Sequence, residues 1–306
     1  MSSGAQVAAS PGSPAETLRG LAVGVALLLS AATEPLAAQY AAVRVQVIDV
    51  GQGDGILIRT PNQRWVLIDA GQGTMFGDSL ATQFGVDRFA IVIGSHRHKD
   101  HIGGIDAVLR ALTTQLYIGD TAEYAGGSDD DRLRAVVRER HIRVAPLRPD
   151  TQMVDGVRFI ILPRPPTIDP DENNNSVTVR LEYGRFSMLF AGDAETAERD
   201  WLVANVPALL DVEVLKAAHH GSTNGTSRAW LAAVTPNYVV ISAGVNRTYR
   251  HPQGEAVAAY LTATGGRLSC TNRQGTVRIY GYADGRVQVR PQRTSNKSCT
   301  YDGTQY

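Results

Sequence analysis

The organisation of this chain follows from one segment, Ser95-His96-Arg97-His98-Lys99-Asp100-His101-Ile102-Gly103-Gly104. A strand-like apolar run precedes it, so we expect a loop at the end of a strand that leads into a helix. His96 and His98 can direct two imidazoles at one divalent cation, while Asp100 and His101 turn toward a second cation beside it. Two such ions about 3.5–4 Å apart would lower the pKa of a bridging water and place a hydroxide against an electrophile.

The composition limits the class of protein to which this segment belongs. The chain has 306 residues, of which 43% are hydrophobic and 20% charged, as in one large globular domain or two small ones. Lys plus Arg and Asp plus Glu both number 30, so any binding to a polyanion has to be local. Only two cysteines occur, which excludes a zinc finger, and metal chemistry therefore has to use histidines and carboxylates.

The N-terminus predicts a signal peptide over residues 1–38. The apolar run 20–33 follows Arg19, is shorter than the roughly 20 residues of a membrane span, and precedes a small-residue segment that ends at Ala38. We therefore expect an exported protein, periplasmic or extracellular, with no stable membrane span after cleavage; an uncleaved anchor is the alternative. Export would allow Cys270 and Cys299 to form a disulfide that ties down the polar tail 293–306, and two free thiols are the alternative.

Between these ends, residues 39–292 predict one α/β domain. Short β-rich runs at 43–50, 55–60 and 65–69 open the domain, and helices then begin to alternate with strands. A second β-rich block, 157–191, is again followed by alternating helices and strands. Two β-rich halves, each covered by helices, predict a four-layer αββα sandwich in which loops of both halves meet along one edge.

Four further segments accompany the histidine cluster in a fixed order. They are Val66-Leu67-Ile68-Asp69-Ala70-Gly71, Phe190-Ala191-Gly192-Asp193, His219-His220-Gly221-Ser222 and Tyr249-Arg250-His251-Pro252. With them the chain resembles the metallo-β-lactamase superfamily over nearly all of residues 43–290. The resemblance is closest to the hydrolase domain of ComEC-type competence proteins, because Val50-Gly51-Gln52-Gly53-Asp54-Gly55 and Leu215–Ser222 match it as well.

The resemblance implies two divalent ions and a set of ligands. These metal ligands are His96, His98, Asp100, His101, Asp193 and His251. Asp193 is expected to bridge both ions, and His251 to complete the second site with Asp100 and His101. The implied catalytic residues are Asp100 together with His219 and His220, one of which would donate a proton to the leaving oxygen of a phosphodiester.

Four other residues are expected near the ions, in supporting roles or at the substrate, namely Asp54, Asp69, Asn175 and Ser222. Asp69 resembles the buried carboxylate that orients a metal-binding histidine, with a turn aspartate as the alternative. Asp54 either lies near the metals or belongs to a hairpin turn only. Ser222 either donates a hydrogen bond to the substrate or caps a helix.

One departure from the superfamily concerns the first metal. Its usual third histidine is absent, and Pro170-Asp171-Glu172-Asn173-Asn174-Asn175-Ser176 stands in that region. The first ion would then bind to His96, His98 and Asp193, helped by Asp171 or Asn175. With fewer nitrogen and more oxygen ligands, Mn²⁺ becomes as plausible an ion as Zn²⁺. The sequence does not decide between the two metals.

The expected substrate is a phosphodiester, with DNA or another nucleic acid as the partner. Local basic residues could neutralise phosphates, namely Arg97, Lys99, Lys216, Arg247 and Arg250. No run in which aromatic and basic residues alternate marks a groove for a single strand. A nuclease is therefore the first hypothesis, a β-lactamase or lactonase on the same fold the second, and a DNA-binding module with a relic site the third.

Overall fold

The computed structural model describes Met1 and residues 41–73, 75–121 and 128–305. The predicted signal peptide lies outside these described residues. Within the described ranges, no helix combines the length and the apolar character that crossing a bilayer requires.

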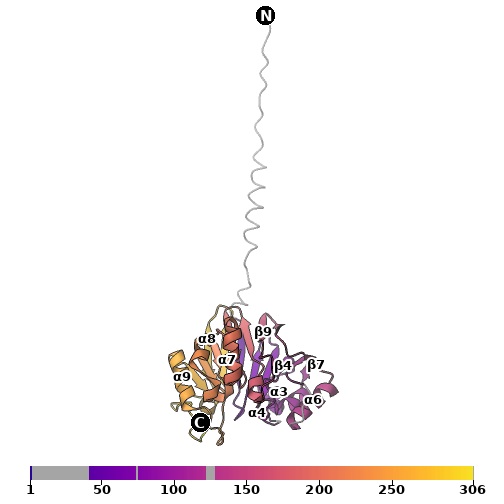
Figure 1. Ribbon diagram of the computed structural model, residues 1–306. Helices are drawn as coiled ribbons and strands as arrows, with labels where there is room; N and C mark the ends of the chain where they lie inside the picture. Colours follow the sequence, from indigo (N-terminus) through magenta and orange to yellow (C-terminus); the bar gives the residue numbers. More distant parts are fainter. Residues whose placement is uncertain (2–40, 74, 122–127, 306) are drawn as a thin grey trace. The chain divides into compact units, whose positions relative to one another are not determined.

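Two β-sheets form the inner layers of the folded unit (Figure 1). The first sheet has the spatial order β16 (Val287–Pro291), β15 (Val277–Tyr282), β1 (Ala42–Val47), β2 (Gly55–Arg59), β3 (Trp65–Ala70), β4 (Arg88–Ile93), β6 (Leu116–Ile118), β7 (Arg143–Ala145), with β5 (Thr113–Thr114) beside β4. The second has the order β14 (Leu268–Cys270), β13 (Tyr238–Ile241), β12 (Val214–Lys216), β11 (Phe186–Phe190), β10 (Val179–Tyr183), β9 (Val157–Ile161), β8 (Asp150–Val154).

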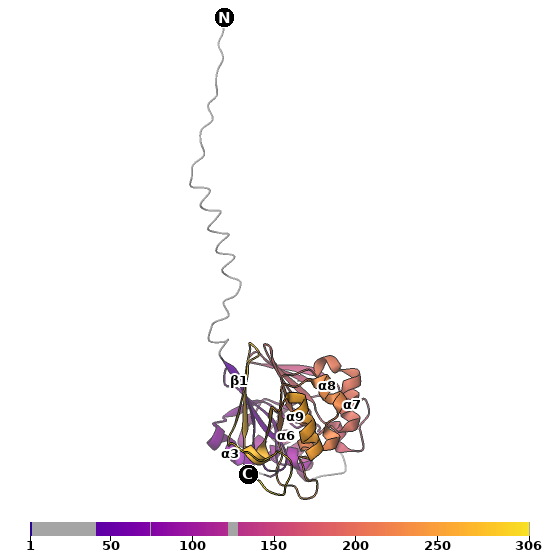
Figure 2. The same cartoon turned by 90° about the vertical axis from the view of Figure 1, so that its left-hand side faces the viewer.

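Helices cover the outer face of each sheet, as Figures 1 and 2 show. The first sheet carries α3 (Met75–Phe84), α5 (Ile105–Ala111) and α6 (Ser128–Glu139). The second carries α7 (Thr196–Asn205), α8 (Arg228–Val234) and α9 (Gly254–Thr264). Short helices lie in the connections, namely α4 (Lys99–Ile102), α10 (Thr271–Gln274), η1 (Glu172–Asn175), η2 (Pro207–Leu209), η3 (Ala218–Gly221) and η4 (Thr223–Gly225). The predicted four-layer αββα sandwich is confirmed.

Alternation along the strands builds the core. In β2, Ile56 and Ile58 point between the two sheets, while Leu57 points to the helices on the outer face. In β11, Met188 lies between the sheets and Leu189 packs under the helices of the other side. Because successive side chains of a strand point to opposite faces, continuous apolar runs of this kind are required of strands buried on both sides.

Helix α3 was not predicted, because its sequence is a weak helix former. Gly77 lies inside it, and glycine disfavours a helix by about 1 kcal/mol relative to alanine. A Cβ at Gly77 would lie 3.1 Å from the backbone nitrogen of Val108 in α5. The glycine therefore allows α3 and α5 to pack closely, and this packing stabilises the helix.

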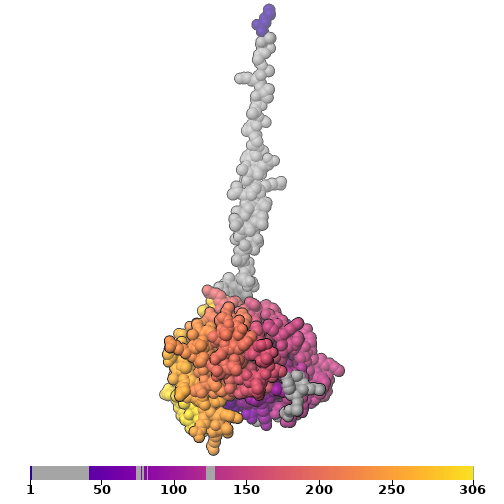
Figure 3. Space-filling view, in the orientation of Figure 1, coloured from indigo at the N-terminus to yellow at the C-terminus, as the bar shows by residue number. Residues whose placement is uncertain are grey.

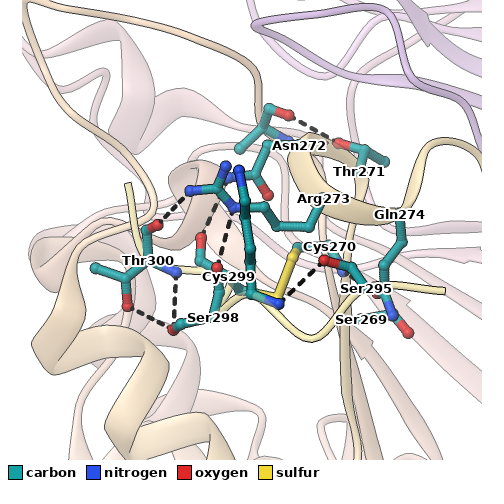
Figure 4. Close-up of a disulfide and its surroundings, with 12 residues drawn as sticks. Ser269, Cys270, Thr271, Asn272, Arg273, Gln274, Ser295, Ser298, Cys299 and Thr300 are labelled. Atoms are coloured by element: carbon teal, nitrogen blue, oxygen red, sulfur yellow. Dashed lines mark hydrogen bonds between the residues drawn. A yellow bond between two sulfur atoms is a disulfide. The ribbon is translucent and has the colours of Figure 1, made fainter. Parts of the chain in front are cut away.

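The C-terminal tail is bound to the second half of the domain. Cys270 and Cys299 form a disulfide, with an S–S distance of 2.08 Å, so the alternative of two free thiols is wrong. Beside it, the guanidinium of Arg273 is buried and donates to the carbonyl oxygens of Ser298 and Thr300, each at 3.0 Å (Figure 4). The tail therefore has a fixed position.

The topology brings polar loops to one edge of the sandwich. Strands β11, β12, β13 and β14 are mutually parallel, as are β3 and β4. Parallel strands end at the same edge of a sheet, where ligands of α/β proteins commonly bind. Segments of the earlier and the later part of the chain consequently share one surface, where magenta meets orange in Figure 3.

Candidate metal centre

Four loops bring the histidines and carboxylates together. The cluster 95–101 follows β4, Asp193 follows β11, and His219 and His220 follow β12. The turn before β2 fits against the cluster because Asp54 donates its backbone N–H to the carbonyl of Asp100 at 3.0 Å. A Cβ at Gly53 would lie 2.0 Å from that carbonyl oxygen, so only glycine permits the approach.

One group of ligand atoms gathers around Asp100, His101 and His220. The Nε2 atoms of His101 and His220 are 3.3 Å apart, and Asp100 Oδ2 lies 3.4 Å from Nε2 of His220. Oδ2 of Asp193 lies 3.2 Å from Nε2 of His101 and 3.1 Å from Nε2 of His220. We call these four residues the second half-site.

A second group of ligand atoms gathers His96 and Asp193, again with His101, and His98 lies beside His96; we call His96, His98 and Asp193 the first half-site. Nε2 of His96 lies 3.1 Å from Nδ1 of His98 and 4.0 Å from Oδ2 of Asp193. His96 is buried and His98 is exposed, so this half-site opens to solvent on the side of His98. Oδ2 of Asp193 is the atom common to both half-sites.

Hydrogen bonds behind the imidazoles fix their tautomers. Nδ1 of His101 donates to Asp69 Oδ2 at 2.8 Å, and Nδ1 of His220 donates to the carbonyl of Ser242 at 2.9 Å. Asp69 also accepts from the Ser95 hydroxyl at 2.6 Å. Because Nδ1 keeps its proton in these bonds, Nε2 of His101 and of His220 is the atom that would give up its proton to a metal ion, the arrangement that metal-ligating histidines adopt.

The electrostatics of the centre favour added positive charge. Burial would lower the pKa of His101, but the carboxylates of Asp193 and Asp69 raise it to about 10. Burial likewise opposes a charge on His220, yet Asp193 and Asp100 hold its pKa well above the usual range. The pKa of Asp193 is well below its usual range because His101 and His220 outweigh the opposing effect of burial. Asp193 therefore stays ionised.

The donor set fits a pair of divalent metal ions. A tetrahedral ion with metal–nitrogen distances of about 2.0–2.1 Å separates its nitrogen ligands by about 3.3 Å, which agrees with the spacing of His101 and His220. Oδ1 of Asp193 is also buried with no hydrogen-bond partner in the described part of the chain. These residues would hold one ion in each half-site, with Asp193 between them.

The second half-site contains His220 in the position that the sequence assigned to His251. His251 is buried, and its ring centroid lies 4.8 Å from that of His219 and 6.4 Å from that of His220. Its Nδ1 has no hydrogen-bond partner among the residues described. His251 and His219 thus lie beside the half-sites and outside their ligand groups.

His219 and His220 separate because both have left-handed backbone angles, with φ of 46° and 52°. The two rings are 6.1 Å apart and inclined by 67°. His219 Nδ1 lies 3.0 Å from Glu195 Oε1 and 3.0 Å from Asn224 Oδ1. This leaves its Nε2 on the side of Asp193, whose Oδ2 is 4.0 Å away.

A buried ion pair lies under the centre. The ammonium of Lys216 contacts Oδ2 of Asp54, donates to the carbonyl of Gly192 at 3.3 Å and lies 4.0 Å from Oδ1 of Asp193. Lys216 and Asp54 are both buried, and Lys216 lowers the pKa of Asp54 to about 2 against the effect of burial. Asp54, Asp69 and His101 also bring their ligand atoms together, but Lys216 already neutralises Asp54 there.

The loop 169–176, in the region of the usual third histidine, is held by hydrogen bonds between its own residues. Asn175 accepts from the backbone of Asp169 at 2.8 Å, and Asp171 accepts from the backbone of Asn173 at 3.1 Å. The hydroxyl of Ser176 accepts from the backbone N–H of Asp193 at 3.0 Å and so positions the bridging aspartate. We therefore place neither Asn175 nor Asp171 on a metal.

Two of the basic residues that were expected to contact phosphate are not accessible to it. Arg97 pairs with Glu172, its Nη2 lying 2.7 Å from Oε2, and Lys216 is buried, so neither is free to contact a phosphate. Lys99 is exposed beside the centre.

Ser222 does not cap the turn that follows it. Instead, Ser227 caps α8 by accepting from the backbone N–H of Trp230 at 3.1 Å.

Sequence reasoning missed three residues that support the centre. They are Ser95 beneath Asp69, Ser176 behind Asp193, and Glu195 behind His219. Ser95 and Glu195 stand next to or near predicted ligands, and that proximity was the only available signal. Nothing in the sequence connects Ser176 with Asp193.

The fold and the centre together define the class. The profile of the metallo-β-lactamase superfamily matches residues 48–245, and the chain belongs to this superfamily. A metallo hydrolase from the archaeon Ignicoccus hospitalis has a similar fold, with a TM-score of 0.50 and 13% identity, covering 81% of this chain and 98% of that one.

Within the superfamily, the chain is related to competence proteins. It is 31% identical to competence protein ComA of Neisseria gonorrhoeae, over 81% of this chain and 33% of that protein. It is 29% identical to ComE operon protein 3 of Bacillus subtilis, over 76% of this chain and 32% of that protein. The chain thus spans about a third of the length of these relatives.

Proposed function

We propose that the protein is an exported phosphodiesterase that cleaves DNA with the help of two divalent ions, Zn²⁺ or Mn²⁺. The observation that carries the proposal is the position of His219, which faces the bridging carboxylate without belonging to a ligand group. Competence is the uptake of DNA by bacteria, so relatives with that name support a nucleic acid as the substrate.

Each half-site has a distinct part in this proposal. Asp100, His101 and His220 would bind one ion, His96 and His98 the other, and Asp193 would bridge them. The ions would supply a water of lowered pKa as the nucleophile and would neutralise charge on the phosphate. Asp69 accepts from Nδ1 of His101 and so holds the ring with Nε2 toward the ion that would bind there.

His219 is the proposed proton donor. Glu195 and Asn224 hold its Nδ1–H, so Nε2 is the atom left to face the substrate. As the oxygen of a hydroxide bonds to phosphorus, the bond to the leaving oxygen breaks, and that oxygen takes the proton from Nε2, which leaves the ring neutral with its remaining proton on Nδ1. Proton transfer of this kind accelerates a reaction about 10²- to 10⁴-fold.

The disulfide supports the proposed export. Disulfides persist in oxidising compartments and are rare in the cytosol. The bond between Cys270 and Cys299 therefore agrees with a signal peptide over residues 1–38.

The first experiment tests the reaction class. Metal-stripped protein receives Mn²⁺ or Zn²⁺ and is assayed on labelled DNA and on bis(p-nitrophenyl) phosphate, with nitrocefin and a lactone in parallel. We expect phosphodiester cleavage that Asp193→Ala abolishes together with most of the bound metal. A metal-loaded wild type that cleaves no phosphodiester would refute the proposal, and turnover of nitrocefin would indicate the lactamase alternative instead.

The second experiment tests the role of His219. A phenolate leaves without protonation, whereas the alkoxide of DNA needs a proton, so His219→Gln should lower DNA cleavage about 10²- to 10⁴-fold and affect the nitrophenyl ester much less. His141→Gln, a change at an exposed histidine, is the matched control. Equal losses on both substrates would exclude His219 as the proton donor.

A further inference from the structure

A groove lies between the segment that carries His251 and the C-terminal tail. Its volume is about 730 Å³. Arg247, Tyr249 and Arg250 line one wall, and Tyr301 and Asp302 of the tail line the other. We call it the tail groove.

The tail wall is held in place by several bonds. The disulfide ties Cys299 to Cys270, and the backbone N–H of Tyr301 donates to the carbonyl of Pro252 at 2.8 Å. Arg273 additionally donates to the carbonyl of Thr304 at 2.9 Å. Figure 4 shows Arg273 next to the disulfide, directed at the tail. The groove is therefore formed before any ligand binds.

The charge of the groove is positive. Arg247 and Arg250 are exposed, and their guanidiniums make no ion pair with any described residue. Asp302 is the acidic residue of the lining, and Arg273 neutralises it across 2.7 Å. Two guanidiniums are thus available for anions, although the whole chain has zero formal net charge.

A row of rings connects the groove with the metal centre. The ring of Tyr249 is stacked on that of His251, with centroids 6.0 Å apart and planes inclined by 29°. The ring of His251 contacts that of His219 edge to face at 4.8 Å, and His219 faces Asp193. Tyr249 is 63% exposed, so its outer surface is available to a further ring.

We propose that the tail groove binds single-stranded nucleic acid next to the metal centre. Arg247 and Arg250 neutralise phosphates, and Tyr249 stacks on an unpaired base. Proteins that bind single strands combine a cationic groove with exposed aromatic rings in this way. The inference rests on the proposed function for the choice of a nucleic acid.

Binding is measured separately from cleavage. The fluorescence anisotropy of a labelled twelve-nucleotide strand reports affinity in the metal-free protein, and bis(p-nitrophenyl) phosphate, which is too small to extend along the groove, reports the centre. We measure the slope of log K against log salt concentration. For Arg247→Gln with Arg250→Gln we expect this slope to be shallower by about 1.4, because each lost phosphate contact contributes about 0.7. Tyr249→Ala should weaken binding about 5- to 150-fold.

A matched control and one further test accompany these variants. Arg138→Gln with Arg140→Gln makes the same charge change at exposed positions of α6 and just beyond it, and should leave strand binding unchanged. Cys270→Ser with Cys299→Ser releases the tail wall and should weaken strand binding while nitrophenyl ester cleavage continues.

The outcomes separate the two proposals. If the wild type cleaves the small ester but the groove variants bind the strand normally, the groove inference is overturned and the phosphodiesterase stands. If binding depends on the groove while no phosphodiester is cleaved, the proposed function fails and the groove remains. Equal affinity for a blunt duplex, lost in the same variants, would refute the assignment to single strands.

Discussion

Replacing Lys216 with methionine removes the ammonium beneath the metal centre and leaves Asp54 charged and buried. Lys216 and Asp54 are 0% and 1% exposed, so solvent cannot substitute for the lost partner. Removing one member of a buried ion pair costs about 3–5 kcal/mol. At about 2–4 °C per kcal/mol, the melting temperature of the metal-free protein should fall by roughly 6–20 °C.

The assay is thermal unfolding of the metal-free protein, because bound ions would add their own stabilisation. Lys99→Met, which removes an exposed lysine from α4, is the matched control and should change stability by no more than about 0.5 kcal/mol. The double variant Asp54→Asn with Lys216→Met removes both charges and should be more stable than Lys216→Met alone. The reasoning would be refuted if the two substitutions lowered the free energy of unfolding additively in the double variant. It would also be refuted if Lys216→Met were as stable as the wild type.

Three further outcomes can be measured. Asp69→Asn should weaken metal binding about 10- to 100-fold in competition with a chelating dye, because asparagine tolerates the left-handed backbone there but orients its histidine partner poorly. Gly53→Ala should cost about 1–3 kcal/mol more in denaturant unfolding than Gly51→Ala, since both have positive φ but only the former would clash; equal costs would contradict the assigned contact. Reducing the Cys270–Cys299 bond, which joins residues 29 positions apart, should lower the free energy of unfolding by about 3–4 kcal/mol, and an unchanged urea midpoint would argue against it.

The fold could be predicted because its strands carry a strong signal. β2 and β11 are mainly apolar on both faces, which predicts strands buried between other layers. The helical segments that follow each β-rich block in the sequence predicted a layer of helices on each sheet. Helix α3 could not be predicted, since Gly77 weakens the local helical preference and the packing partner Val108 lies 31 positions later. Contacts across that distance have no local pattern in a sequence.

The centre was predictable in its residue types and less so in its geometry. The adjacent histidines 219 and 220 looked equivalent, and the left-handed backbone that directs them apart depends on tertiary contacts such as the one with Ser242. Lys216 was expected to contact phosphate, because its partner Asp54 is 162 positions away. The groove could not be predicted for the same reason, since its two walls, 247–254 and 300–303, come from separate segments of the chain.

The two half-sites are chemically unequal. The second offers two imidazoles and two carboxylates, while the first, with a serine behind its aspartate, offers two imidazoles and a shared oxygen. An ion held by fewer groups escapes sooner, so occupancy of the first position would follow the free metal concentration of the surroundings. At low metal concentration the first ion would dissociate and the proposed activity would be lost. The fold would persist, because the disulfide and the buried Lys216–Asp54 pair do not depend on that ion, and activity would return when metal is added.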